Sequence, residues 1–311
     1  MTNKKKFIIG SRGSKLSLAY SNHVRDLLVK SNSGLNESLI EIKIIKTSGD
    51  IFQNKRISEI GGKGVFCKQI EEELLDSKID MAVHSLKDLP TKMTDGLCVK
   101  AVVKRNDPRD AFISYSSKSF SKLKPQSKIG TSSFRRQAQL NLLRKDLKII
   151  EMRGNIDTRI KKLKNQEFDA IVLSLAGIQM LNLGNEVKEV FSTKQMLPAI
   201  GQGTIALQCK KDDQKTLDIL KTINDKETYN CILAERALLE AIGGDCDTAI
   251  GGLAKLSDQE ISLRSELFSN DGSKKFEFQS SGNFKNAKEI GYKVDEELLK
   301  KAGPNFTVEG N

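Results

Sequence analysis

The stretch over residues 128–159 limits the possible folds of this chain more than any other part of the sequence. Its pattern is that of a short strand, a tight turn and a helix, which occurs twice in succession, in KIGTSSFRRQAQL and in LKIIEMRGNIDTR. The pattern places polar side chains around two successive helix beginnings: Ser132, Ser133, Arg135, Arg136, Arg153 and Arg159. A chain that repeats this order is predicted to build an α/β sheet.

The arginines in these turns indicate an anion site. A helix N-terminus has free N–H groups and partial positive charge, so Asp or Glu is the usual charged residue there. An arginine pair at such a position suggests that an anion docks, and a guanidinium group binds carboxylates in a bidentate way. The alternative is two capped helices with solvated basic faces.

The same order of elements occurs in other parts of the chain. FIIGSRGSKLSLAYSNHVRDLLVK, residues 7–30, predicts a strand, a turn and an amphipathic helix, and IDMAVHSLKDL is echoed by FDAIVLSLAGI at 168–178. Two candidate crossover segments, VVKRNDPRDAFIS and MLPAIGQGTIALQCK, let the chain leave one lobe and return to it. We therefore expect two doubly wound lobes, lobe 1 from residues 1–103 and 204–221 and lobe 2 from residues 109–197.

The pattern changes after residue 225. A helix, KETYNCILAERALLEAI, is followed by a Gly-rich loop over 243–256, by hairpin-like alternation over 260–282 and by a last helix over 286–303. This order predicts a small α+β domain over 226–311. In the first lobe, the polar stretch 48–62 is long enough to act as a lid.

Composition narrows the range of partners. The net charge is +11 and the pI near 9.3, but aromatic residues make up 5% of the 311 residues and Trp is absent, so small polyanionic substrates fit better than nucleic acid. No apolar run is long enough to span a bilayer, and the first residues lack an apolar signal core. The five cysteines contain no CxxC pair and histidines number only two, which predicts reduced thiols in the cytoplasm and no metal site.

Two further sites carry candidate chemistry. Lys87 and Asp88 follow an apolar strand; Lys87 could be a nucleophile or an anion ligand, and Asp88 a general acid or base or the counter-ion of a cation. The alternative is a solvated turn. Cys246 lies among glycines in the predicted loop, and its neighbours Asp245 and Asp247 would raise a thiol pKa, which favours an attachment point over a turnover nucleophile.

Taken in order, these motifs resemble the porphobilinogen deaminase family. The resemblance rests on GSRGSKLSLA, GGKGVFCKQIE, DMAVHSLKDLPT, RNDPRDAFIS, IGTSSFRRQAQL, RGNIDTR, DAIVLSLAG, LPAIGQG and the Cys246 loop, from about residue 7 to residue 255. It implies two periplasmic-binding-protein-like doubly wound lobes and a small α+β C-terminal domain. It also implies a dipyrromethane cofactor joined by a thioether to Cys246, and no metal.

The resemblance implies an activity and a role for each site residue. Four porphobilinogen molecules are joined head to tail on the dipyrromethane primer with loss of ammonia, and hydrolysis releases hydroxymethylbilane. By motif, Lys87, Ser133, Arg135 and Arg136 hold cofactor carboxylates, Arg12, Ser14, Arg153 and Arg159 hold the substrate, and Asp88 accepts pyrrole N–H groups and stabilises cations. We expect a monomer that binds porphobilinogen and the growing polypyrrole, without nucleic acid or a membrane. The alternative is a two-lobed small-anion binding protein without catalysis.

Overall fold

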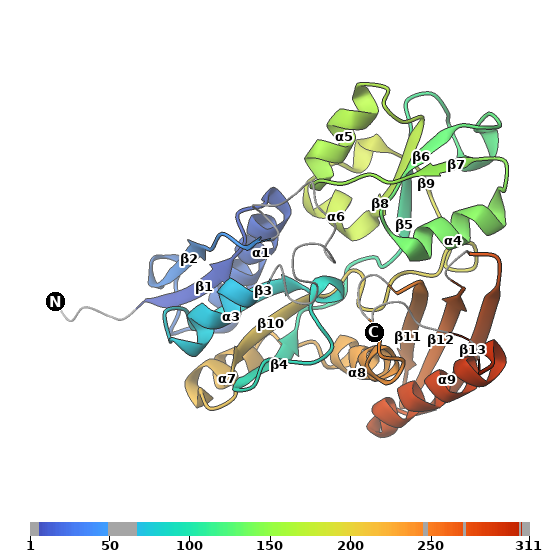
Figure 1. The fold of residues 1–311 in the computed structure, drawn as a ribbon. Helices are drawn as coiled ribbons and strands as arrows, with labels where there is room; N and C mark the ends of the chain where they lie inside the picture. Colours follow the sequence, from blue (N-terminus) through green and yellow to red (C-terminus); the bar gives the residue numbers. More distant parts are fainter. Residues whose placement is uncertain (1–5, 49–66, 245–247, 270–271, 305, 307–311) are drawn as a thin grey trace. The chain divides into compact units, whose positions relative to one another are not determined.

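The structure is a computed structural model that describes residues 6–48, 67–244, 248–269, 272–304 and 306 (Figure 1). The chain forms two compact units, one from residues 1–105 and 204–229 and the other from residues 106–203 and 230–311. The polypeptide therefore crosses from one unit to the other three times. Cys246 and nearly all of the predicted lid lie outside the described residues.

Unit 1, which is residues 1–105 with 204–229, is built on a five-stranded sheet in the order β2-β1-β3-β10-β4. β1 is parallel to both of its neighbours, whereas β10 is antiparallel to β3 and to β4. The strands are β1 (Phe7–Ser11), β2 (Ile40–Ile44), β3 (Met81–Ser85), β4 (Leu97–Val102) and β10 (Ile205–Lys210). The helices with it are α1 (Lys15–Ser31), α3 (Lys68–Leu75) and α7 (Gln214–Lys221).

Unit 2, which is residues 106–203 with 230–311, begins with a second five-stranded sheet in the order β7-β6-β8-β5-β9. Its strands are β5 (Asp110–Ile113), β6 (Lys128–Gly130), β7 (Lys148–Ile150), β8 (Ala170–Ser174) and β9 (Val187–Val190). Its helices are α4 (Phe134–Leu143), α5 (Ile156–Lys164) and α6 (Leu175–Met180).

Helices cover both faces of this second sheet. Phe112 and Val172 pack in one cluster with Leu140 of α4, whereas their strand neighbours Ile113 and Ile171 pack in another cluster with side chains of α5 and α6. Successive residues of a strand point to opposite faces, so the two clusters lie on the two sides of the sheet. This arrangement confirms the predicted doubly wound α/β fold class.

The two sheets share one topology. In each, three strands are parallel and a fourth strand, which follows a crossing between the units, is antiparallel to the third: β10 beside β3 and β5 beside β8. The sequence echo noted above falls on equivalent strands, β1 with β6 and β3 with β8. The repeated pattern in the sequence therefore corresponds to a repeated arrangement of strands.

The last part of unit 2 is an antiparallel sheet with helices. β11 (Ile250–Ser257), β12 (Glu260–Phe268) and β13 (Lys275–Asn283) lie side by side in that order. α8 (Lys226–Ala241) and α9 (Ala287–Ala302) share its apolar core, and α9 runs along the sheet (Figure 1). A Cβ atom on Gly291 of α9 would lie 2.4 Å from the Ala234 carbonyl oxygen of α8, so glycine permits this close helix contact. Whether this part is a separate domain from residues 109–197 stays a prediction.

The predicted Gly-rich loop over 243–256 is wrong in its second half. Gly251 and Gly252 lie in β11, and a Cβ atom on Gly252 would meet Ile200 Cγ1 at 2.9 Å. The Gly252 N–H donates to the Pro198 carbonyl oxygen at 2.9 Å. These glycines allow the backbone of the 197–200 segment to approach the strand, rather than marking a loop.

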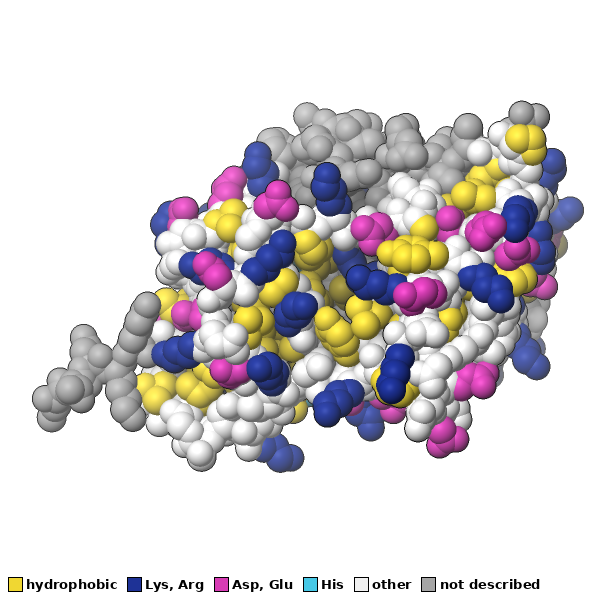
Figure 2. Space-filling view, turned by 90° about the horizontal axis from the view of Figure 1, so that it is seen from below, with side chains coloured by type: hydrophobic (Ala, Val, Ile, Leu, Met, Phe, Trp, Pro, Cys, Tyr) yellow, Lys and Arg dark blue, Asp and Glu magenta, His cyan; other side chains and the backbone are white. Residues whose placement is uncertain are grey.

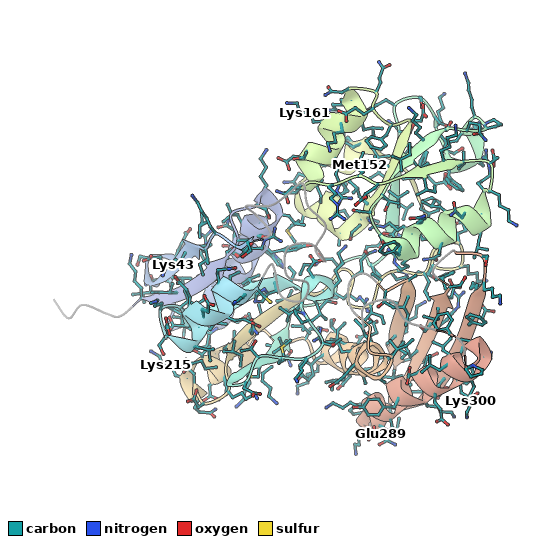
Figure 3. The ribbon with its side chains drawn as sticks, viewed as in Figure 1. Lys43, Met152, Lys161, Lys215, Glu289 and Lys300 are labelled. Carbon is teal, nitrogen blue, oxygen red and sulfur yellow. The ribbon has the colours of Figure 1, made fainter. Side chains whose placement is uncertain are left out.

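Surface charge is mixed in sign. Lys161 of α5, Lys215 of α7 and Lys300 of α9 are exposed on the outer sides of their helices (Figure 3). On the face seen in Figure 2, Lys and Arg side chains are interspersed with Asp and Glu. Among the described helices, none is long and apolar enough to cross a membrane.

Candidate functional site

In unit 1, four predicted site residues lie in turns at one edge of the sheet. β1 and β3 are parallel neighbours, so the turns that follow them leave the sheet at the same edge. Arg12 and Ser14 follow β1, and Lys87 and Asp88 lie in the short 3-10 helix Leu86–Asp88 that follows β3. The Leu86 N–H donates to the Thr204 carbonyl oxygen at 3.0 Å, which ties this turn to the start of β10.

Ser14 is the N-cap of α1. Its hydroxyl oxygen accepts a hydrogen bond from the Ser17 N–H at 3.2 Å, and the same hydroxyl donates to Ser17 Oγ at 2.9 Å. A capping hydroxyl of this kind satisfies one of the free N–H groups of the helix. The position of Ser14 is therefore fixed by the helix that it begins.

Asp88 is exposed and lies near two buried titratable groups. Burial and the Asp88 carboxylate together raise the pKa of Tyr20, which lies on α1. Burial lowers the pKa of His84 to about 4, and the charges of Arg12 and Asp88 act on it in opposite directions. The His84 Nε2 atom lies 2.9 Å from Gln208 Oε1, so the buried ring has a polar partner. Arg12 and Asp88 therefore belong to one electrostatic environment.

In unit 2, the two predicted turns also lie side by side, because β6 and β7 are parallel neighbours. The Ser132 hydroxyl group after β6 donates to the Met152 carbonyl oxygen after β7 at 2.9 Å. Arg159 Nε donates to the Gly154 carbonyl oxygen at 2.7 Å, and its Nη2 donates to Ser132 Oγ at 3.3 Å. Ser133 is the N-cap of α4 and accepts from the Arg136 N–H at 3.4 Å. The structure thus connects the two helix beginnings by side-chain hydrogen bonds.

Arg153 forms an ion pair with Glu151 at the second turn. Its Nε donates to Glu151 Oε1 at 2.7 Å, and its Nη2 lies 2.6 Å from the same oxygen. The two side chains are 27% and 43% exposed, respectively. Exposed ion pairs of this kind are worth about 0–1 kcal/mol, so an incoming carboxylate can compete with Glu151 for Arg153.

Arg135 and Arg136 are buried, and both contact Asp110 at the start of β5. Arg135 Nη1 donates to Asp110 Oδ2 at 2.9 Å, and Arg136 donates to Oδ1 from Nε at 3.0 Å and from Nη2 at 2.7 Å. Gln202 Nε2 also donates to Oδ1, at 3.0 Å. Both arginines thus have a carboxylate of the protein itself as a partner, and their role toward a bound anion stays a prediction.

Two carboxylates act on the buried arginines: Asp110 contacts both, and the buried Glu266 acts on Arg135 through its charge. Burial by itself raises the pKa of the Asp110 carboxyl group, but the charges of Arg135 and Arg136 outweigh burial and hold that pKa well below its usual range. Arg135 Nε is buried without a hydrogen-bond partner among the described residues, so this N–H can still donate to an acceptor.

Sequence reasoning gave no role to Asp110, Gln202 or Glu235. Glu235 of α8 is fully buried and accepts the Gly201 N–H at 2.7 Å and the Ala254 N–H at 2.8 Å, so it fastens the 197–203 segment to β11. Asp110 and Gln202 stand in the two segments interpreted as crossovers, RNDPRDAFIS and LPAIGQG. The sequence signal that could have identified Asp110 and Gln202 is that each is a polar residue next to an apolar strand in those segments.

Cys246, the predicted attachment residue, lies outside the described residues. The described cysteines, Cys67, Cys98, Cys209 and Cys231, are buried free thiols. Within the part of the chain that the structure describes, no group of three or more His, Cys, Asp or Glu side chains could hold a metal ion.

The fold and the site define a class of α/β protein in which basic side chains gather in the turns after the strands of two similar sheets. The family described as porphobilinogen deaminase, dipyromethane cofactor binding domain, matches residues 7–218, and the family described as porphobilinogen deaminase, C-terminal domain, matches residues 229–300. The chain belongs to the porphobilinogen deaminase family. Its larger part is the dipyrromethane cofactor-binding domain of that family, so the cofactor expected from the resemblance is confirmed.

Curated relatives carry the same name over nearly their full length. The chain is 45% identical to porphobilinogen deaminase of Ehrlichia canis over 293 residues, which are 94% of this chain and 96% of the relative. It is 41% identical to porphobilinogen deaminase of Syntrophomonas wolfei over 301 residues, which are 97% of each chain. Membership of this family supports the enzyme over the alternative of an anion-binding protein without catalysis.

A limited structural likeness was also found. An ABC transporter periplasmic substrate-binding protein from Coxiella burnetii has a TM-score of 0.44 and 13% identity, covering 71% of this chain and 92% of that chain. Nothing about the ligand follows from it.

Proposed function

We propose that the chain is hydroxymethylbilane synthase. It joins four porphobilinogen molecules head to tail with loss of ammonia and releases hydroxymethylbilane by hydrolysis. The observation that carries this proposal is the match to both porphobilinogen deaminase regions, in order, over residues 7–218 and 229–300. The identity of 45% to a relative of that name over 94% of the chain supports it.

The chain's own residues suit an anionic cofactor. When bound, dipyrromethane supplies the free pyrrole position to which porphobilinogen is added. Cys246 would hold it through a thioether, and Lys87, Ser133, Arg135 and Arg136 would hold its carboxylates. The unpartnered Arg135 Nε supports this assignment, because a buried guanidinium N–H favours a nearby acceptor with negative charge.

Substrate carboxylates would be held by Arg12, Ser14, Arg153 and Arg159. Arg153 is well suited to this role because its partner in the structure is the exposed Glu151. Exchange of one carboxylate for another leaves the charge of the pair unchanged and costs little at an exposed position. Asp88 is an exposed carboxylate whose charge acts on Tyr20 and, together with that of Arg12, on His84. It would accept pyrrole N–H groups and stabilise positive charge that develops in the substrate.

We further propose that the enzyme is a cytoplasmic monomer whose partners are porphobilinogen and the growing polypyrrole, with neither nucleic acid nor a membrane. Free thiols at the described cysteines agree with a reducing compartment. Mass measurement in solution tests the oligomeric state.

Intact mass of the denatured protein tests the cofactor. We expect an excess equal to two porphobilinogens less two ammonias in the wild type and in Cys231→Ser, a control for a buried thiol in α8. The excess should disappear in Cys246→Ser. Addition of porphobilinogen to the wild type should release one ammonia for each molecule consumed. A bare mass together with no ammonia release would overturn the proposal.

A second experiment tests the substrate role of Arg153. Arg153→Gln should raise KM for porphobilinogen while the cofactor mass excess stays intact. Arg144→Gln is the control: Arg144 pairs with Asp146 two residues away at 2.6 Å with similar exposure of 23% and 39%, and it also donates to the Ser121 and Leu123 carbonyl oxygens at 3.1 Å. An equal effect of the two substitutions on KM would show that Arg153 acts only through surface charge or stability.

A further inference from the structure

Two cysteines face each other on neighbouring strands of unit 1. In the antiparallel pairing of β4 with β10, Cys98 is directly opposite Cys209, next to the pair Leu97 and Lys210. The ladder shift in this pairing lies between Leu207 and Gln208, so the ladder is regular at the cysteines. Both residues are free thiols.

The register brings the two residues within the range of a disulfide bond. Directly opposite residues of antiparallel strands have Cα atoms about 4.5–5.5 Å apart. Disulfide-bonded cysteines usually have Cα atoms about 4.4–6.8 Å apart. Directly opposite residues of an antiparallel pair present their side chains on the same face of the sheet, so the two thiols lie on one face. The register therefore places the two cysteines where a disulfide bond can form.

The two thiols differ in access and in acidity. β4 is an edge strand of its sheet and Cys98 is 8% exposed, whereas β10 lies between β3 and β4 and Cys209 is 0% exposed. The neighbouring Cys209 thiol lowers the pKa of Cys98, the nearby cations Lys100 and Lys211 lower it further, and burial opposes them. The neighbouring Cys98 thiol and burial raise the pKa of Cys209. Cys98 is therefore the thiol that ionises first, and although it is buried it is the more exposed of the two.

We propose that Cys98 and Cys209 form a dithiol modification site that low-molecular-weight disulfides oxidise to a cross-strand disulfide. The Cys98 thiolate attacks one sulfur of the reagent disulfide, forms a mixed disulfide and releases one thiolate. The Cys209 thiol then gives up its proton and attacks Cys98 Sγ, and the second reagent thiol leaves. The protein loses two electrons and two protons, and the reagent disulfide is reduced to two thiols.

The disulfide would join the two strands that flank the excursion of the chain through residues 106–203, which affects stability. β4 is the last strand before the chain leaves unit 1, and β10 is the first strand after its return. The disulfide would close a loop that contains all of residues 106–203. A cross-link around such a long loop restricts the unfolded chain, so the oxidised protein should unfold at a higher urea concentration than the reduced protein.

Oxidation of the native full-length protein with glutathione disulfide tests the proposal. After incubation, free thiols are alkylated in denaturant and the peptides are mapped by mass spectrometry. We expect two fewer alkylated cysteines in the oxidised wild type than in the untreated protein. The map should also contain a peptide pair joined through Cys98 and Cys209, which dithiothreitol separates. Cys231→Ser, which removes a buried thiol of α8, should behave like the wild type.

Two single variants test the order of the steps. Cys209→Ser should stop at the mixed disulfide and retain glutathione on Cys98, whereas Cys98→Ser should leave Cys209 unmodified because it is fully buried. Full alkylation of both thiols in folded, oxidant-treated wild type would overturn the proposal, and so would glutathione on Cys209 in the Cys98→Ser variant. If a variant fails to fold by circular dichroism, the peptide map of the wild type decides.

Discussion

Replacing Asp110 by asparagine would remove the only negative charge from the cluster formed by Asp110, Arg135, Arg136 and Gln202. In the wild type, four N–H donors reach the two carboxylate oxygens at 2.7–3.0 Å, and the Asp110 side chain is 0% exposed. Asparagine keeps one acceptor oxygen but leaves two buried guanidinium groups without the carboxylate that contacts both of them. Removal of one partner from a buried ion pair costs about 3–5 kcal/mol, so we expect Asp110→Asn to lower the free energy of unfolding by about that amount.

Urea unfolding followed by circular dichroism measures this change, and Asp146→Asn is the matched control. Asp146 also pairs with an arginine, at 2.6 Å, but its side chain is 39% exposed, so its loss should cost less than about 1 kcal/mol. A loss of stability in Asp110→Asn no larger than that in Asp146→Asn would refute the reasoning.

The pH dependence of the Asp110 contribution gives a second check. The pKa of Asp110 is lowered in the folded protein, so its contribution is complete above the unfolded value of about 3.9 and is lost as pH falls toward the folded value. The difference in unfolding free energy between wild type and Asp110→Asn should therefore be constant from pH 8 to pH 5. A difference that fell steeply across that range would assign the effect to another titrating group.

Three other predictions concern single residues. Asp88→Asn should slow ammonia release from porphobilinogen by about 100-fold or more, because a carboxylate facing developing positive charge is lost, and the intact mass should still show the cofactor. Gly291→Ala places a Cβ atom 2.4 Å from the Ala234 carbonyl oxygen and should cost about 1–3 kcal/mol in thermal or urea unfolding, whereas Gly184→Ala, with nothing within 4 Å, should change stability by less than about 0.5 kcal/mol. Burial lowers the pKa of His84 to about 4, so its ring signals in proton NMR, assigned with a His84→Gln variant, should stay constant from pH 8 to pH 6; titration near pH 6.5 would contradict the burial seen here.

The alternation of strands and helices could be predicted because it depends on local patterns of apolar and turn residues. The strand–turn–helix order at residues 7–30 and again from residue 128 appears as β1 with α1 and as β6 with α4. Parallel pairing then places the turns at common sheet edges, so Arg12 and Asp88 share one edge and Ser132 and Arg159 share another. The position of each turn after its strand could therefore be read from the order of residues along the chain.

The partners of the arginines could not be predicted, because they are set by contacts between distant residues. Nothing local in NDPRD distinguishes Asp110, which is buried between two arginines, from Asp107, which pairs with the neighbouring Arg109. Gly252 failed as a loop signal for the same reason, since the approach of the 197–200 segment depends on tertiary packing.

The place of β10 between β3 and β4 bears on how the chain is made. While the ribosome is still adding residues 106–203, β4 lacks its only neighbour in the sheet, and the nascent first unit can pair no more than β1, β2 and β3. At typical rates of synthesis this state lasts on the order of ten seconds. During that interval the unpaired edges of β3 and β4 can form hydrogen bonds with strands of other chains. We therefore expect the nascent chain to be most prone to aggregation, and most dependent on chaperones, at this stage of synthesis.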